Sequence, residues 1–127
     1  MERLAWVCLG SAIGGGLRYL TQQAAAALLG LAFPYGTLFV NVSGSFLIGL
    51  IMHVGLSTDA VSPTTRLFLT TGIMGGLTTY SAFNYETLGL LREGALLIAS
   101  LNLVLTVVLC LVAGLLGLAA GRAWVGG

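Results

Sequence analysis

Four long apolar stretches follow one another along the chain, with short polar segments between them. They run from Leu4 to Leu29, from Gly36 to Gly55, from Thr64 to Arg92 and from Ala95 to Ala120. Each has at least the roughly 20 residues that a helix needs to cross the hydrocarbon core of a bilayer. The pattern predicts an all-α integral membrane fold, with four transmembrane helices in a single domain over residues 1–127.

The third stretch is expected to be a broken helix. Gly72, Gly75 and Gly76 lie close together, and polar and aromatic residues follow them as far as Thr87. Irregular backbone at membrane depth survives only where protein buries it or where it lines a cavity, because each unpaired polar group costs several kcal/mol in hydrocarbon. Such a break is typical of an ion or substrate site, since freed carbonyls bind cations and helix N-termini bind anions.

Composition strengthens the membrane assignment. The chain is 57% hydrophobic and only 7% charged, whereas soluble domains average about 25% charged residues. The net charge of +1 favours neither a nucleic-acid partner nor a polybasic membrane anchor. Cys8 and Cys110 lie in apolar runs without metal-ligand spacing, so buried free thiols are expected.

The arginines are nearly balanced across the predicted membrane. With four spans both termini share one side, where Arg3, Arg66 and Arg122 fall, against Arg92 and Arg18 towards the other side. This bias is weak under the positive-inside rule, so such a chain could insert both ways and form an antiparallel dimer.

Glycines also recur at a spacing typical of close helix packing. Three pairs are four residues apart: Gly10 with Gly14, Gly72 with Gly76, and Gly117 with Gly121. Small residues at this spacing let helix backbones approach closely. Packing within the chain is the simpler interpretation of any one pair, and an oligomer is expected because four thin helices bury little by themselves.

Polar and aromatic residues form three stripes at membrane depth. The stripes are Thr37, Asn41 and Ser45; Asn102, Thr106 and Cys110; and Tyr80, Phe83 and Thr87. They fit hydrogen bonding and packing between helices, and they also fit an ion path. Hydroxyl and amide donors without fixed negative charge suit a small anion, and aromatic ring edges carry positive partial charge.

Three ionisable residues in or near the predicted spans need an interpretation of their own. Arg18 could attract anions into a vestibule or extend to the lipid headgroups. Glu86, the only acid that could serve proton-coupled transport, lies near one end of the third stretch. His53 lies near the end of the second stretch and is interpreted as interfacial.

Two long runs resemble the signatures of a known family. Gly36–Gly49 (GTLFVNVSGSFLIG) and Thr71–Phe83 (TGIMGGLTTYSAF) resemble the motifs of the Fluc (CrcB) fluoride channels, and Gly14–Tyr19 (GGGLRY) fits as well. The order of the motifs and the four spans extend the resemblance over the whole chain.

The resemblance implies a passive, fluoride-selective channel that exports cytoplasmic fluoride and so relieves its toxicity. It implies an antiparallel, dual-topology homodimer with two pores, lying multi-pass among the lipids of the inner (plasma) membrane. It further implies a structural sodium ion at the dimer centre, held by the backbone carbonyls of Gly75 and Thr78. The candidate pore-lining or fluoride-binding residues are Asn41, Tyr80, Phe83, Ser81, Thr37, Asn102, Thr106 and Arg18.

One position departs from the family pattern. The first aromatic residue of the second motif is normally Phe, and here it is Tyr80. Its hydroxyl could hold fluoride too tightly or crowd the pore. We therefore expect Tyr80 to slow conduction while leaving the fold and the dimer intact.

Three other functions agree less well with the sequence. A small multidrug-type proton-coupled exporter needs a glutamate embedded in the first helix, where this chain has only Glu2 at the extreme end. An intramembrane serine protease would need Ser43 or Ser81 beside His53, and Ser43 and His53 lie at different depths of one helix. A purely structural membrane subunit is the last alternative. No catalysed reaction is expected, so the chain is not expected to be an enzyme.

Overall fold

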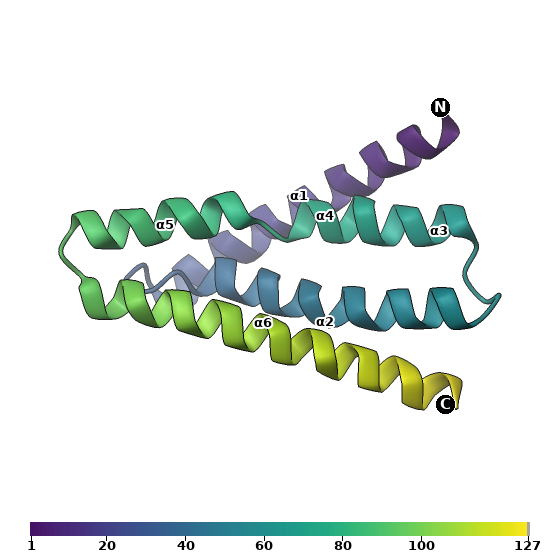
Figure 1. Ribbon diagram of the computed structural model, residues 1–127. Coiled ribbons are helices and arrows are strands. Elements are labelled where there is room, and N and C mark those ends of the chain that lie inside the picture. Colours follow the sequence, from purple (N-terminus) through teal and green to yellow (C-terminus); the bar gives the residue numbers. More distant parts are fainter. Residues whose placement is uncertain (127) are drawn as a thin grey trace.

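A computed structural model describes residues 1–126, which form seven helical segments. The segments are α1 (Glu2–Leu29), α2 (Tyr35–Ser57), α3 (Pro63–Leu67), η1 (Phe68–Met74), α4 (Gly75–Leu77), α5 (Tyr80–Arg92) and α6 (Leu96–Val125). Four consecutive segments, α3 to α5, run end to end as one interrupted rod, so the chain forms four rods as predicted (Figure 1). The predicted bounds are close, although the last helix continues beyond Ala120 to Val125.

The rods form a bundle in which both termini lie at the same end (Figure 1). The most extensive packing interface joins α2 to α6, which run antiparallel side by side. Helix α1 crosses behind them and packs mainly on η1 and α4. The bundle therefore has its interrupted rod fixed along one half by α1, while α5, among the described residues, packs only on α2 and α6.

Glycine permits the closest backbone approaches. A Cβ on Gly14 would collide with the carbonyl oxygen of Ile73 and lie 2.8 Å from the amide nitrogen of Leu77. A Cβ on Gly76 would lie 2.5 Å from the carbonyl oxygen of Ser11. The paired glycines on α6 approach α2 in the same way. The interpretation of these pairs as packing within the chain is therefore confirmed.

The third rod is discontinuous as predicted, but the glycines do not cause the break. Gly72 and Gly76 lie inside helical segments and pack against α1. The helix is interrupted at Thr78 and Thr79, whose backbones are extended with ψ angles of 153° and 118°. Thr79 then caps α5, because its Oγ1 accepts a hydrogen bond from the Ala82 N–H at 3.2 Å.

The rod also begins and winds differently from a plain helix. Pro63 is the first residue of α3, and the Ser62 hydroxyl accepts a hydrogen bond from the Thr65 N–H at 3.1 Å. Proline suits the first turn because its missing N–H has no helical partner there. The following η1 is a π-helix, a form that frequently marks functional sites.

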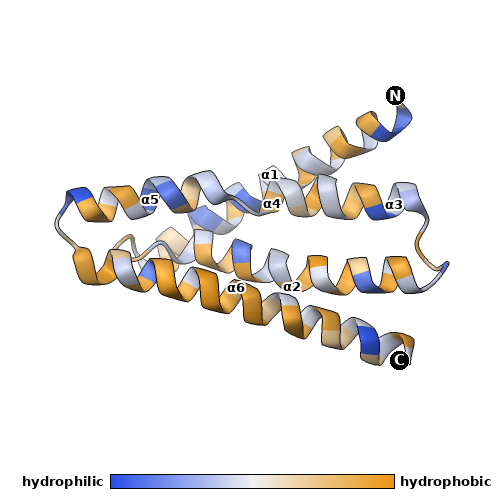
Figure 2. Ribbon diagram, viewed as in Figure 1, coloured by the Kyte–Doolittle hydropathy of each residue, from blue (hydrophilic) through white to orange (hydrophobic). Residues whose placement is uncertain are grey.

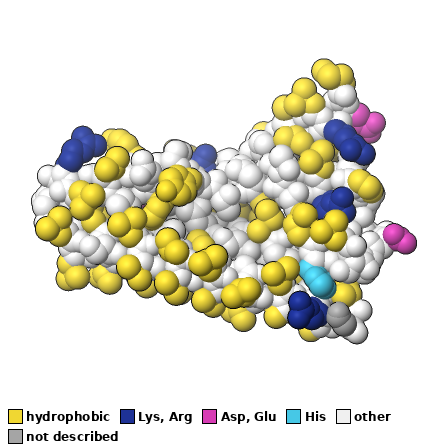
Figure 3. Space-filling view, viewed as in Figure 1, with side chains coloured by type: hydrophobic (Ala, Val, Ile, Leu, Met, Phe, Trp, Pro, Cys, Tyr) yellow, Lys and Arg dark blue, Asp and Glu magenta, His cyan; other side chains and the backbone are white. Residues whose placement is uncertain are grey.

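The outer surface is that of a membrane protein. Helices α2 and α6 are each long and apolar enough to cross a bilayer, and apolar residues run along nearly the whole of α6 (Figure 2). Charged side chains lie mostly at the two ends of the face in Figure 3, and hydrophobic ones cover the length between them. Exposed apolar surface on this scale marks contact with lipid or with another protein.

One cysteine differs from the prediction, and one histidine nitrogen is buried. Both cysteines are free as expected, but Cys8 is exposed and Cys110 only half-buried, so the prediction of buried thiols is wrong for Cys8. The reason is that Cys8 lies on the outer side of α1, away from the face that Gly10 and Gly14 bury. His53 packs against Gly121, and its Nε2 is buried without a hydrogen-bond partner among residues 1–126.

The glycine packing predicts a matched pair of variants. We expect Gly14→Ala to lower the free energy of unfolding by about 1–3 kcal/mol, because the added methyl group forces two backbones apart. Gly15→Ala is the control, since nothing lies within 4 Å of a Cβ at that position. Thermal unfolding of both variants in detergent checks this, and equal stability of the two would contradict the packing argument.

Candidate functional site

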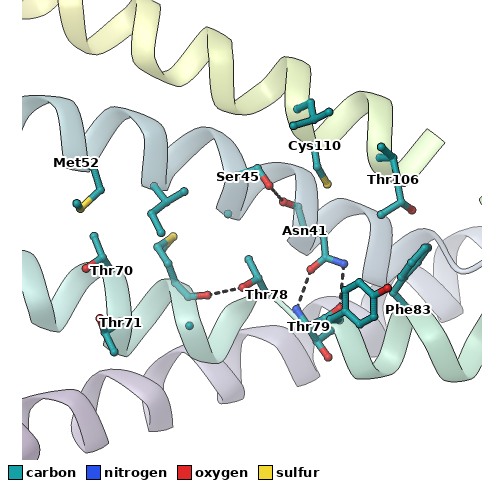
Figure 4. A pocket seen from close by; sticks show the side chains of 17 residues that line it. Asn41, Ser45, Met52, Thr70, Thr71, Thr78, Thr79, Phe83, Thr106 and Cys110 are labelled. Atoms are coloured by element: carbon teal, nitrogen blue, oxygen red, sulfur yellow. Dashed lines mark hydrogen bonds between the residues drawn. The ribbon is translucent and has the colours of Figure 1, made fainter. Parts of the chain in front are cut away.

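Asn41 of α2 satisfies the backbone at the break. Its Nδ2 donates to the Thr79 carbonyl at 3.1 Å, and its Oδ1 accepts from the Thr79 N–H at 2.8 Å (Figure 4). In a continuous helix that N–H would bond to the carbonyl of Gly75. One buried amide side chain, 9% exposed, thus replaces the missing helical bonds on both sides of Thr79.

The backbone carbonyls before the break differ in the hydrogen bonds that they accept. Arg18 of α1 donates from Nε to the Gly76 carbonyl at 3.1 Å, which anchors this half-buried arginine on the broken rod. The Met74 carbonyl accepts from both the N–H and the Oγ1 of Thr78, at 3.0 and 2.9 Å. The Gly75 carbonyl loses its helical donor to Asn41, and Gly75 itself is exposed.

Hydrogen bonds between side chains hold α5 in place. Thr37 of α2 donates to Glu86 Oε1 at 2.5 Å, and Asn102 of α6 donates from Nδ2 to Thr87 Oγ1 at 2.9 Å. Thr106 in turn donates to Asn102 Oδ1 at 3.4 Å. The interpretation of the polar stripes as helix-to-helix hydrogen bonding is therefore confirmed for Thr37 and Asn102. Thr106 bonds within α6, and the role of all three in a pore stays a prediction.

A cavity of about 840 Å³ lies along the break (Figure 4). Six of the predicted site residues line it: Asn41, Gly75, Thr78, Tyr80, Phe83 and Thr106. Four others do not line it: Arg18, Thr37, Ser81 and Asn102. The first group comes from α2, from the two sides of the break and from α6, so the tertiary fold brings polar groups of three rods to one cavity whose lining is otherwise largely apolar.

Sequence reasoning missed several polar residues of this cavity. They are Thr70, Thr71 and Thr79. A signal for one of them was present, because Thr71, Gly75 and Thr78 follow the i, i+4, i+7 spacing of one helix face. The hydroxyls of Thr70 and Thr78 also bond to carbonyls one turn earlier in their own rod.

The two aromatic residues differ in exposure. Tyr80 and Phe83 meet edge to face, with ring centroids 5.7 Å apart and planes at 72°. Phe83 is 6% exposed, whereas Tyr80 is 79% exposed beside the cavity. In an edge-to-face pair the positive edge of one ring points at the negative face of the other, and the remaining positive ring edges are the parts that an anion can approach.

The described residues offer no side-chain metal cluster. Among residues 1–126, no three His, Cys, Asp or Glu side chains gather where they could hold a metal ion. The candidate ligands are instead backbone carbonyls at the break, which are hard oxygen donors. The Gly75 carbonyl is suited to be such a ligand, because it has lost its helical donor and Gly75 lies on the cavity wall.

These features define a class of protein. A small bundle with an apolar surface carries an interrupted helix, and uncharged donors around the interruption line a cavity. Discontinuous helices of this kind bind ions and small substrates in membrane channels and transporters.

Comparison with known proteins identifies the family. Residues 5–118 match the family described as CrcB-like protein, Camphor Resistance (CrcB), and the chain belongs to this family. A protein of Anaeromyxobacter sp. (strain K) named fluoride-specific ion channel FluC is 58% identical over 89% of this chain and 90% of its own length. Another of that name, from Sorangium cellulosum (strain So ce56), is 46% identical over the full length of both chains. The predicted family is thus confirmed, and it is a family of ion channels, not of enzymes.

The bond pair at the break predicts a second effect on stability. We expect Asn41→Leu to destabilise the protein by about 1–3 kcal/mol, because it leaves the N–H and carbonyl of Thr79 unpaired in a buried site. Asn84→Leu is the control, since Asn84 is exposed on the adjoining α5. Unfolding in detergent measures both, and a similar small loss in the two variants would show that Asn41 does not support the break.

Proposed function

We propose that this chain forms a fluoride-selective passive channel that exports fluoride from the cytoplasm and so relieves its toxicity. The observation that carries the proposal is the lining of the cavity at the break. Among the described residues that form it, hydroxyls, an amide and aromatic edges lie beside apolar side chains, and Asp, Glu, Lys and Arg are not present. The identical name of the relatives, fluoride-specific ion channel, supports the choice of ion.

The physical task of such a channel is to remove the hydration shell of a small anion. Donors on successive turns can replace water in steps, and conduction requires that no single site binds too tightly. Asn41, Phe83 and Thr106 come from three different helices and line the same cavity. Chloride is larger, so a narrow path that depends on close donors would reject it.

The remaining predicted residues belong to this proposal with other roles. Thr37 and Asn102 hold α5, and Arg18 holds the rod before the break. Ser81 is exposed next to Tyr80 and shares a 3.3 Å hydrogen bond with Thr79. We place all of them around the anion path, either lining it or fixing the groups that do.

The working unit is proposed to be an antiparallel, dual-topology homodimer in the inner (plasma) membrane, with each chain crossing four times and two pores per dimer. Its support is the open side of the site, where Tyr80 is 79% exposed and Gly75 is also exposed. A second copy on this side would bury both. The ends of the bundle carry few arginines, Arg3, Arg66 and Arg122 against Arg92, while Arg18 is bonded at the break, so the charge bias for one orientation is small.

A structural sodium ion between the two copies completes the proposal. The Gly75 and Thr78 carbonyls of each chain would hold it, and the ion would add positive charge that offsets these converging dipoles. The freed Gly75 carbonyl and the position of both residues on the cavity support this assignment. A small multidrug-type exporter is not favoured, because acidic residues are missing from the apolar part of α1 after Glu2.

The proposed function predicts selective anion release from vesicles. Liposomes holding the purified protein and potassium fluoride should release fluoride rapidly once valinomycin carries the compensating potassium. Matched liposomes loaded with potassium chloride should release no chloride. A fluoride electrode records the first and a chloride electrode the second, and silence in both, from protein that elutes as a single folded species, would contradict the proposal.

The exposed tyrosine predicts a gain of function. Tyr80→Phe should raise the fluoride rate several-fold in the same assay, because it removes a hydroxyl that can bind the ion or narrow its path. Tyr85→Phe is the control, since Tyr85 is also exposed on α5 but does not line the cavity. An unchanged rate in Tyr80→Phe would show that the hydroxyl does not limit conduction.

A further inference from the structure

A chain of side-chain hydrogen bonds links α1 to α5, although these helices do not pack against each other within the described residues. Gln22 of α1 donates from Nε2 to Thr37 Oγ1 at 3.1 Å. The Thr37 hydroxyl then donates to Glu86 Oε1 on α5 at 2.5 Å. Thr37 is therefore the bridge through which α1 acts on the only acid in the middle of α5.

Gln22 and Glu86 together orient the Thr37 hydroxyl. A threonine hydroxyl has a single proton and two acceptor lone pairs. The amide N–H of Gln22 occupies one lone pair, and the proton points to Glu86. Thr37 is only 3% exposed, so water cannot easily replace either partner. The arrangement fixes Oε1 of Glu86 as an acceptor that points towards α2.

The bond from Thr37 keeps the Glu86 side chain in one of two neighbouring cavities. Glu86 lines a second cavity of about 410 Å³, together with Gln22 and Thr37, and it does not line the larger cavity at the break. Phe83, which does line the larger cavity, lies one turn away on the same helix. Residues at i and i+3 share a helix face, so a released Glu86 side chain could turn towards the larger cavity.

A carboxyl group in the larger cavity would oppose anion passage. Its oxygen atoms would compete for the donors that replace the water around the ion, and in ionised form it would repel the ion directly. Among the described residues that line the smaller cavity, the other charged group is Glu93, another acid, so none of them is a cation that would hold Glu86 in place. The Thr37 hydroxyl is the partner that keeps it there.

We propose that Gln22 is a positioning residue of the channel, which acts through Thr37 to hold the Glu86 carboxyl group in the smaller cavity and away from the anion path. Its effect on flux rests on the function proposed above, whereas the hydrogen-bond arrangement does not. The two parts can therefore be tested separately.

The flux test uses Gln22→Met, which keeps an unbranched side chain of similar length but lacks the donor. Gln23→Met is the matched control, because Gln23 is exposed on the neighbouring position of α1. We expect Gln22→Met to slow fluoride release from liposomes several-fold and Gln23→Met to leave it unchanged.

A second background separates positioning from general packing. In Glu86→Gln protein, Gln22→Met should cause no further loss, because the carboxyl group that it releases is gone; coupled residues are expected to show such non-additivity. An equal loss in both backgrounds, or no loss in either, would overturn the proposal.

Infrared spectroscopy tests the hydrogen bonds without any flux. The carboxyl stretching band that Glu86→Gln removes belongs to Glu86, and it should shift in Gln22→Met but not in Gln23→Met. If the wild-type protein passes no fluoride, the proposed function fails while this band still decides the arrangement. If Gln22→Met does not fold, Thr37→Val takes its place and should shift the same band. An unmoved band overturns the proposal.

Discussion

The exchange of two hydrogen bonds between Asn41 and Thr79 is the interaction on which the rest of the structure depends. A helix that stops within a bilayer leaves an N–H and a carbonyl without partners, and lipid offers none. The amide of asparagine matches that need, since it carries one acceptor and donors on a short, rigid stem. With the break stabilised in this way, the rod can turn a row of hydroxyls and carbonyls towards a cavity without unfolding.

The two halves of the interrupted rod are held by different forces. The first half lies against α1 through glycines that let backbones touch, and Arg18 adds a bond to the Gly76 carbonyl. The second half, α5, buries only Phe83 and Thr87. It is held chiefly by polar links to α2 and α6, which suits a membrane, where apolar burial between helices provides little driving force.

This division has a functional meaning within a channel family. A tightly packed half fixes the carbonyls before the break, while a half held by a few hydrogen bonds carries the aromatic pair and the carboxyl group of Glu86. The exposed Tyr80 and Gly75 leave one side of the site uncovered in a single chain. A site with one wall missing is what a second copy would complete, and this is the physical basis of the proposed dimer.

Local patterns in the sequence determined the four rods, their approximate bounds and the fact that the third is interrupted, because apolar length and polar composition act over neighbouring residues. The motifs around Asn41 and Tyr80 also determined the family. Only the tertiary structure decided that the break falls at Thr78 and Thr79, since Gly72 and Gly76 are needed inside the helix for contact with α1, a partner that is distant in sequence. It also decided that Arg18 is anchored on a carbonyl, and that Glu86 and Phe83 face different cavities. Such choices depend on which donors and acceptors of other helices come within reach, and spacing along one helix does not contain that information.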